Sequence, residues 1–236
     1  VQSRNYKVKK IIYLESKKIL IVKYLKKNLY KILKNKKINK IALFSSVVPK
    51  YSLMLKKCLK KFYKIDLKEI KDKKISKIVK INIKNKNQVG SDRIVNAVGV
   101  YKKYKKNAIV LDFGTATTFD VVVKNKYLGG VIAPGVSLSL INLSSRASLI
   151  PKINLLKTSS VIGTNTVSAV RSGFYWGYSG LIENIIKLII KQTKKSFKIV
   201  ITGGLAHLFK NSIKRKVTIK KDLTIIGILK IIKKIK

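Results

Sequence analysis

Apolar residues recur three or four positions apart over long stretches of the chain, which is the period of an α-helix with one buried face. Residues 11–34 show this spacing and predict one or two amphipathic helices. The same spacing returns over 52–63, 136–145 and 166–191. The last stretch, 223–235, is amphipathic and basic, and we expect it to pack against the body of the protein rather than on a membrane surface.

Short apolar runs between turn residues predict strands. Residues 41–48 form one such run, whereas the pattern over 65–89 is thin and predicts short strands at best. Residues 109–133 predict a β-meander, and 197–201 predict a last strand that runs into Thr202-Gly203-Gly204 and a helix. Strands, then helices, then a strand that opens a helix are typical of an α/β half with its own core.

The amino-acid composition of the chain changes near residue 107, where Lys becomes rarer and Gly, Thr and Ser become common. We therefore expect an N-terminal half over 1–106 and a C-terminal α/β half over 107–236. The 236 residues exceed the ~100–150 of a typical domain and suffice for a sizeable core.

The chain is strongly basic. It has 54 Lys and Arg against 9 Asp and Glu, a formal net charge of +45, and five of the basic residues are Arg. Such a charge attracts polyanions, so a basic nucleic-acid-binding protein is one alternative. Specific readers of nucleic acid rely on Arg for bidentate contacts, however. The spread of Lys over nearly the whole chain therefore favours a solvated surface and no specific nucleic-acid partner.

The number of cysteines and the hydropathy of the chain indicate the cellular compartment to expect. The single Cys58 cannot form an intrachain disulfide, so nothing calls for an oxidising compartment. No stretch reaches the ~18 uninterrupted apolar residues of a membrane span, and Lys interrupts each apolar run near the N-terminus. We therefore expect a cytoplasmic protein with no membrane partner.

The segment from Leu111 to Thr118 places Asp112 at the end of a buried strand, followed by a turn with Gly114 and several hydroxyls. Such a turn offers backbone N–H and side-chain O–H donors to phosphate, and the carboxylate can hold a cation or a water. A plain hairpin turn with Thr as a strand former is an equally good explanation of this segment alone.

Gly90-Ser91-Asp92-Arg93 stands where Ser91 predicts the start of a helix that runs through Tyr101. We expect the guanidinium beside Asp92 to favour the ionised carboxylate, which is the form that a general base needs. The same guanidinium can form a bidentate contact with an anionic substrate. Taken alone, a first-turn Asp that suits the helix dipole is the more common explanation.

Thr202-Gly203-Gly204 follows a strand, and two glycines there let the backbone come close to a flat or anionic ligand near a helix N-terminus. Tight packing of the strand against the helix explains them equally well. His207, in the following helix, is expected to be a surface or capping residue, because no second His is present to share a metal.

Six segments stand in a recognisable order: Ser45-Ser46-Val47-Val48-Pro49, Val89 to Ala97, Asp112 to Thr118, Gly129-Gly130-Val131-Ile132-Ala133-Pro134-Gly135, Ile162 to Val167, and Thr202 to Ala206. Together they resemble type III pantothenate kinase, the family that phosphorylates pantothenate at the start of coenzyme A synthesis. The resemblance covers most of residues 40–227 and is far more specific than any one segment.

The resemblance implies an α/β, actin-like (ribonuclease H-related) fold of two domains with ATP between them. It implies a homodimer that completes the pantothenate site. The expected activity is the ATP-dependent phosphorylation of pantothenate to 4′-phosphopantothenate, with Mg²⁺ and a monovalent cation, K⁺ or NH₄⁺.

The resemblance also assigns roles to residues. Asp92 would take the proton from the pantothenate hydroxyl, and Asp112 would hold the monovalent cation. The expected substrate-binding residues are Gly90, Ser91, Asp92, Arg93 and Thr166, and the expected ATP-binding residues are Gly114, Thr115, Gly203 and Gly204.

Two features depart from the family pattern. Family members open with a strand and an Asp-x-Gly-Asn-Thr phosphate turn, which residues 1–40 do not match, so we expect the chain to begin after that hairpin. The family also places an aromatic residue shortly before Gly90, and 82–89 contain none. These departures keep open a second alternative, a degenerate relative with a binding or regulatory role.

Overall fold

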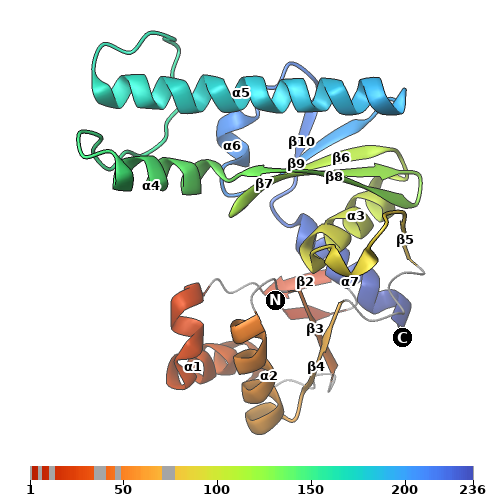
Figure 1. Cartoon of the computed structure of the whole chain (residues 1–236). Coiled ribbons are helices and arrows are strands. Elements are labelled where there is room, and N and C mark those ends of the chain that lie inside the picture. Colours follow the sequence, from red (N-terminus) through yellow and green to blue (C-terminus); the bar gives the residue numbers. More distant parts are fainter. Residues whose placement is uncertain are drawn as a thin grey trace. The chain divides into compact units, whose positions relative to one another are not determined.

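A computed structural model of the chain describes residues 2–4, 7–10, 14–34, 41–45, 49–70 and 78–235. The chain forms two compact units, one of residues 1–102 with 224–236 and the other of residues 103–223 (Figure 1). The domain boundaries expected from the sequence, 1–106 and 107–236, stay a prediction. The compact units differ from them mainly at the C-terminus, where 224–236 return to the first unit.

The first unit holds short strands and amphipathic helices. Its strands pair as β1 (Gln2–Arg4) with β2 (Lys7–Lys10), antiparallel, and as β3 (Ile41–Phe44) with β4 (Asp66–Glu69), parallel. Its other elements are η1 (Ser16–Leu20), α1 (Val22–Leu33), α2 (Pro49–Tyr63), β5 (Lys80–Ile81), η2 (Lys86–Gln88), most of α3 (Ser91–Tyr104) and nearly all of α7 (Leu223–Ile235).

The helical spacing of the sequence correctly predicted α2 and α7. Residues 11–34 contain α1 and the short η1, although 11–13 lie outside the described residues. The strand predicted over 41–48 is β3 as far as Phe44, and 46–48 also lie outside the described residues. Leu59, Ile65 and Leu67 form a small buried cluster that joins α2 to β4.

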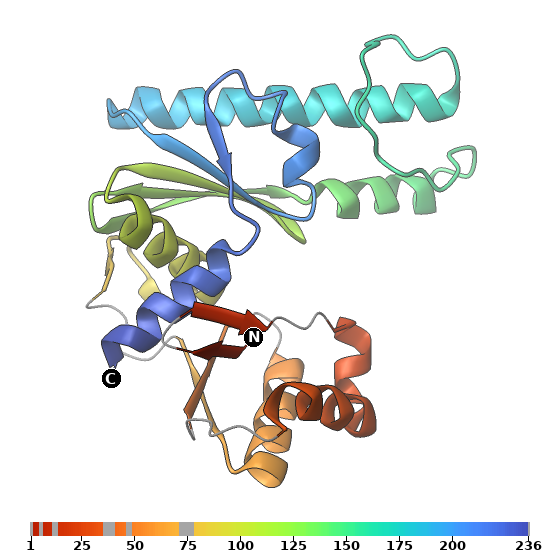
Figure 2. The same ribbon diagram turned by 180° about the vertical axis from the view of Figure 1, so that it is seen from behind.

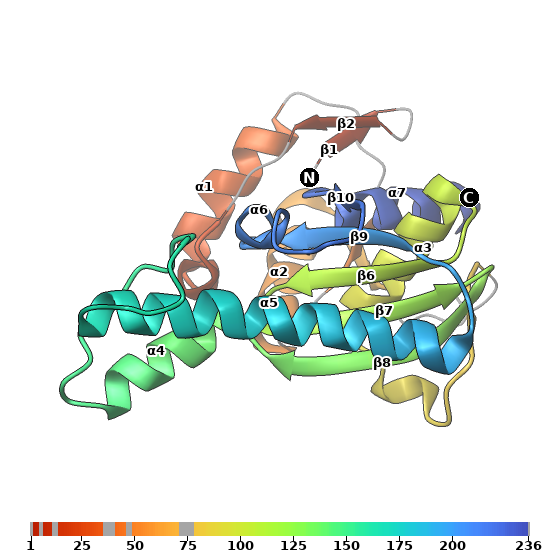
Figure 3. The ribbon, with the colours of Figure 1, turned by 90° about the horizontal axis from the view of Figure 1, so that it is seen from above.

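The second unit is built on a mixed sheet. Its strands are β6 (Ala108–Phe113), β7 (Ala116–Val123), β8 (Lys126–Pro134), β9 (Lys198–Gly203) and β10 (Val217–Ile219). They lie in the order β10-β9-β6-β7-β8, as Figure 3 shows from above. The meander of β6, β7 and β8 is antiparallel, whereas β9 and β10 are added in parallel on the other side of β6. This is the strand order of the ribonuclease H-related fold that the sequence resemblance implies.

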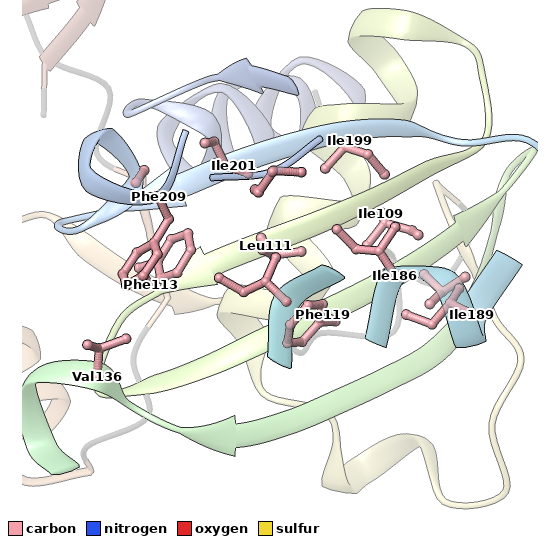
Figure 4. Close-up of a cluster of buried hydrophobic side chains, with 14 of the residues drawn as sticks. Ile109, Leu111, Phe113, Phe119, Val136, Ile186, Ile189, Ile199, Ile201 and Phe209 are labelled. Carbon is pink, nitrogen blue, oxygen red and sulfur yellow. The ribbon is translucent and has the colours of Figure 1, made fainter. Parts of the chain in front are cut away.

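Three helices complete the second unit: α4 (Val136–Arg146), α5 (Thr166–Thr193) and the short α6 (Ala206–Phe209). The long α5 lies over one face of the sheet and contributes Ile186 and Ile189 to its core (Figure 4). Phe113 of β6 stacks on Phe209 of α6 with ring centroids 5.2 Å apart. The end of β6 is therefore fixed by aromatic packing on the same face as α5.

Within the described residues, no helix combines the length and apolar character needed to cross a bilayer.

Cys58 gives a test of the packing in the first unit. Its side chain is 3% exposed on α2, and burial raises the pKa of the thiol above its ordinary value, opposed in part by the charge of Lys61. The thiol is thus kept protonated near pH 8, and modification by Ellman's reagent should be at least about tenfold slower in native buffer than in guanidinium chloride. Equal rates in the two solvents would contradict the buried position of Cys58.

Candidate active site

The turn between β6 and β7 presents polar groups at the carboxyl end of a buried strand. Asp112 is half-buried and lies opposite Thr118 of β7, while Gly114 and Thr115 are exposed in the turn itself. The Gly114 N–H donates to the Ala116 carbonyl oxygen at 3.1 Å and closes the turn. The exposed backbone and hydroxyl of this turn are donors of the kind that hold phosphate oxygens.

Gly203 ends the neighbouring strand β9 directly beside this turn. It pairs with Phe113 in the parallel ladder, and its φ of +90° lies in the region that favours glycine. A Cβ at Gly203 would lie 2.5 Å from the Phe113 carbonyl oxygen, so the close approach requires glycine. The Gly204 N–H then donates to the same oxygen at 3.1 Å. Two motifs about 90 residues apart in sequence, predicted separately, thus meet at one end of the sheet.

The turn also contacts the start of α4. A Cβ at Gly135, which caps α4, would overlap the Thr115 carbonyl oxygen. Gly135, the last glycine of the segment Gly129 to Gly135, therefore allows α4 to begin directly against the turn between β6 and β7. His207 is exposed, as expected from the sequence, and its Nδ1 lies 3.1 Å from the Gly204 carbonyl oxygen, within hydrogen-bonding distance.

A cavity of about 560 Å³ opens beside these glycines, and the sequence did not predict it. Its walls come from α4, from residues 152–155 and from Leu205, which follows Gly204. Leu140, Ile141 and Leu155 supply apolar surface, and Lys152 with several serines supplies polar groups. Apolar walls with a few polar groups are typical of a pocket for a small organic ligand.

In the first unit, α3 carries the predicted Gly-Ser-Asp-Arg motif at its start. Asp92 lies in the first turn, half-buried, and its Oδ1 accepts a hydrogen bond from the Arg93 N–H at 2.8 Å. A Cβ at Gly90 would lie 2.5 Å from this Oδ1. Glycine at position 90 therefore leaves the space that the carboxylate occupies.

Ser91 is fully buried, unlike its neighbour Asp92. Its Oγ lies 2.9 Å from the Oγ of Ser45, and the two hydroxyls share a hydrogen bond. Ser45 opens the segment Ser45 to Pro49, of which 46–48 lie outside the described residues. The side chain of Ser91 thus ties the start of α3 to the residue that follows β3.

Thr166 is the first residue of α5 and is exposed. Asn165 caps the helix by accepting from the Ser168 N–H at 2.9 Å, and Ser168 Oγ accepts from the Asn165 N–H at 3.1 Å. Arg171 donates to the Asn154 carbonyl oxygen at 3.1 Å and holds the preceding loop against α5. The N-terminus of α5 is therefore fixed by side-chain bonds, and Thr166 stands at its exposed end.

The predicted residues thus form two groups. Asp112, Gly114 and Thr115 adjoin Gly203 and Gly204 in the second unit, which also contains Thr166, and residues 90–93 lie in the first unit. In the part of the chain that the structure describes, no three His, Cys, Asp or Glu side chains gather as metal ligands usually do.

Known proteins resemble this chain closely. Residues 6–188 match the type III pantothenate kinase family. A type III pantothenate kinase of Pelagibacter ubique is 56% identical over 230 residues, which cover 98% of this chain and 91% of the relative. Another, from Paramagnetospirillum magneticum, is 40% identical over 191 residues, or 80% of this chain and 74% of the relative.

Among solved structures, a Baf family protein from Campylobacter jejuni superposes with a TM-score of 0.55 at 20% identity, covering 87% of this chain and 86% of that one. At this identity the likeness concerns the fold alone. Together with the strand order of the second unit, it confirms the α/β, actin-like fold class predicted from the sequence.

Replacement of Gly203 tests the meeting of β6 and β9. Gly203→Ala should lower the free energy of unfolding by about 1–3 kcal/mol, because the new Cβ meets the Phe113 backbone at a positive φ. Gly204→Ala is the matched control: nothing lies within 4 Å of its added Cβ, and we expect a change within about 0.5 kcal/mol. Urea denaturation measures both, and equal effects would contradict the geometry.

Proposed function

The chain belongs to the type III pantothenate kinase family, and from this premise we propose that it transfers the γ-phosphoryl group of ATP to the hydroxyl of pantothenate. The product is 4′-phosphopantothenate, the first intermediate on the way to coenzyme A. Within the structure, the observation that carries the proposal is the meeting of the Asp112–Thr115 turn with Gly203 and Gly204.

The phosphates of ATP would lie against this meeting point. Gly114 and Thr115 expose N–H and hydroxyl donors there, and the two glycines of β9 remove side chains that would block a close approach. Phosphoryl transfer depends mostly on positioning and on neutralising the charge of the moving group. A fixed turn of donors at the end of a buried strand meets that requirement.

The neighbouring cavity would take the base of the nucleotide. Its apolar walls, from Leu140, Ile141 and Leu155, suit a flat aromatic ring, and Leu205 joins it directly to the glycines beside the phosphates. The volume of about 560 Å³ is ample for a purine and its ribose.

Asp92 would act as the general base. Its carboxylate would accept the proton of the pantothenate hydroxyl while that oxygen attacks the γ-phosphorus. Gly90, Arg93 and Thr166 would bind pantothenate, with the Arg93 guanidinium suited to its carboxylate. Since the hydroxyl of Ser91 bonds to Ser45, we assign Ser91 a part in holding this motif in place.

Cations would supply positive charge to the phosphates. Mg²⁺ would accompany ATP, and Asp112 would hold K⁺ or NH₄⁺. The half-buried Asp112 carboxylate at the end of β6 offers the oxygen ligands that hard cations prefer, which fits this assignment.

A homodimer in the cytoplasm is the remaining part of the proposal. Leu149, Val161 and Ile162, in the loop before α5, are 88%, 67% and 82% exposed. Exposed apolar side chains on one loop favour a protein partner, and a second copy of the chain is the partner that the family resemblance implies. The comparisons favour neither the nucleic-acid-binding nor the regulatory alternative.

The activity itself is tested by pantothenate-dependent ADP release in Mg²⁺ and K⁺. Asp92→Asn keeps the shape of the side chain but removes the base, and we expect kcat to fall about 100-fold or more. A variant that retains the wild-type kcat would exclude Asp92 as the base. Wild-type protein that is folded and releases no ADP would contradict the proposed activity.

The nucleotide pocket is tested at its rim. Ile141 is 61% exposed and lines the cavity, so Ile141→Glu should put a charged carboxylate into the apolar wall that would face the base, at little cost to folding. We expect the KM for ATP to rise about fivefold or more while the KM for pantothenate stays the same. Leu138→Glu, on the same helix but outside the cavity wall, is the control and should leave both constants unchanged.

A further inference from the structure

The C-terminal helix α7 lies directly on α3, the helix that begins with the Gly-Ser-Asp-Arg motif (Figure 2). Gly227 of α7 is buried, and a Cβ there would overlap the Val95 carbonyl oxygen and lie 2.6 Å from Val95 Cγ1. The backbones of the two helices therefore touch, which only glycine at position 227 permits. Any side chain there would have to move one helix away from the other.

A hydrogen bond joins the same two helices. Thr224 Oγ1 donates to Asn96 Oδ1 at 2.9 Å, across 128 positions of sequence. Thr224 and Gly227 are three residues apart and therefore lie on one face of α7. Asn96 is 1% exposed, so its amide cannot exchange this bond for bulk water at no cost.

These contacts fall one turn from Asp92. A helix repeats every ~3.6 residues, so Val95 and Asn96 stand one turn beyond Asp92 on the same side of α3. On the N-terminal side, Ser91 is held by Ser45 at 2.9 Å. The Asp92 carboxylate therefore extends from a turn of helix that is fixed both before and after it.

We propose that α7 positions the catalytic base, with Thr224 and Gly227 as the positioning residues that act through Asn96 and Val95. The proposal rests on the role assigned to Asp92 above. A general base must hold its carboxylate within hydrogen-bonding distance of the reacting hydroxyl, and displacement by ~1 Å can reduce the rate ~100-fold. Loosening of α7 should thus lower kcat without affecting the binding of ATP.

The first experiment compares Thr224→Val with Thr224→Ser. Valine has the shape of threonine but cannot donate to Asn96, and we expect kcat to fall about tenfold while the KM for ATP stays within about twofold. Serine restores the hydroxyl and should restore kcat. If Thr224→Ser does not restore kcat, the hydroxyl of residue 224 does not position the base, which contradicts the proposal.

The pH profile separates positioning from stability. An enzyme that has lost its base depends on hydroxide to accept the proton, so its rate rises with pH, as expected for Asp92→Asn. We expect Thr224→Val to show this rise between about pH 7 and 9, where the wild-type rate should be level. A reduced rate with the wild-type profile would indicate a smaller folded fraction and would overturn the proposal.

The second experiment compares Gly227→Ala with Gly180→Ala. The added methyl at 227 meets Val95, and kcat should fall about 30-fold or more as α3 is displaced. Gly180 lies on α5 with nothing within 4 Å of an added Cβ, and its replacement should leave kcat unchanged. If Gly227→Ala does not fold, the comparison of Thr224→Val with Thr224→Ser still tests the positioning role of α7.

The outcomes distinguish the two claims. If the wild-type protein shows no pantothenate-dependent turnover, the proposed function is contradicted. The role of Asp92 as the base, on which the role of α7 depends, is then contradicted as well. Turnover that is equal in wild type, Thr224→Val and Gly227→Ala contradicts the positioning role of α7 and leaves the proposed function intact.

Discussion

The six residues of β6 pair in parallel with the six of β9, and most of the side chains along both strands are fully buried. The arrangement of the second unit depends on this pairing. It fixes the end of β6, where Asp112 and the turn stand, against Gly203 at the end of β9. Because parallel strands end at the same edge of a sheet, the two glycine-containing segments meet there whatever the length of chain between them.

The core stabilises this edge from one side. Phe113, the last residue of β6, stacks on Phe209 with the rings inclined by 9°, and Tyr175 of α5 stacks on Phe209 in turn with centroids 5.9 Å apart. The turn that would hold phosphate thus follows a residue that cannot move without disturbing three aromatic rings. A rigid turn keeps its donors aimed at the phosphates without reorganisation during transfer.

The excess of Lys has little part in this arrangement. Charged side chains that pair, such as Glu15 with Lys18 at 2.7 Å and Glu183 with Arg215 at 3.3 Å, lie at the surface, where water and salt screen an ion pair and it adds little stability. Lys26 lies 4.5 Å from the centroid of the Phe62 ring, so its charge rests over an aromatic face. The stability of both units comes from their apolar clusters, and the lysines keep the surface hydrated.

Patterns in the sequence correctly predicted the helices α2, α4, α5 and α7 and the meander, whereas the resemblance to a known family supplied the candidate site residues. Helical period, turn glycines and the ends of buried strands are local properties, and local properties can be read from neighbouring residues. The strands β4 and β5 escaped individual prediction because their short segments carry hardly any alternation. The tertiary structure was needed to show that Gly203 touches Phe113, that Ser45 bonds Ser91, and that a cavity opens beside Leu205. It alone brought Thr224 and Gly227 against α3, because periodicity states which face of a helix is buried, whereas the path of the whole chain determines what that face meets.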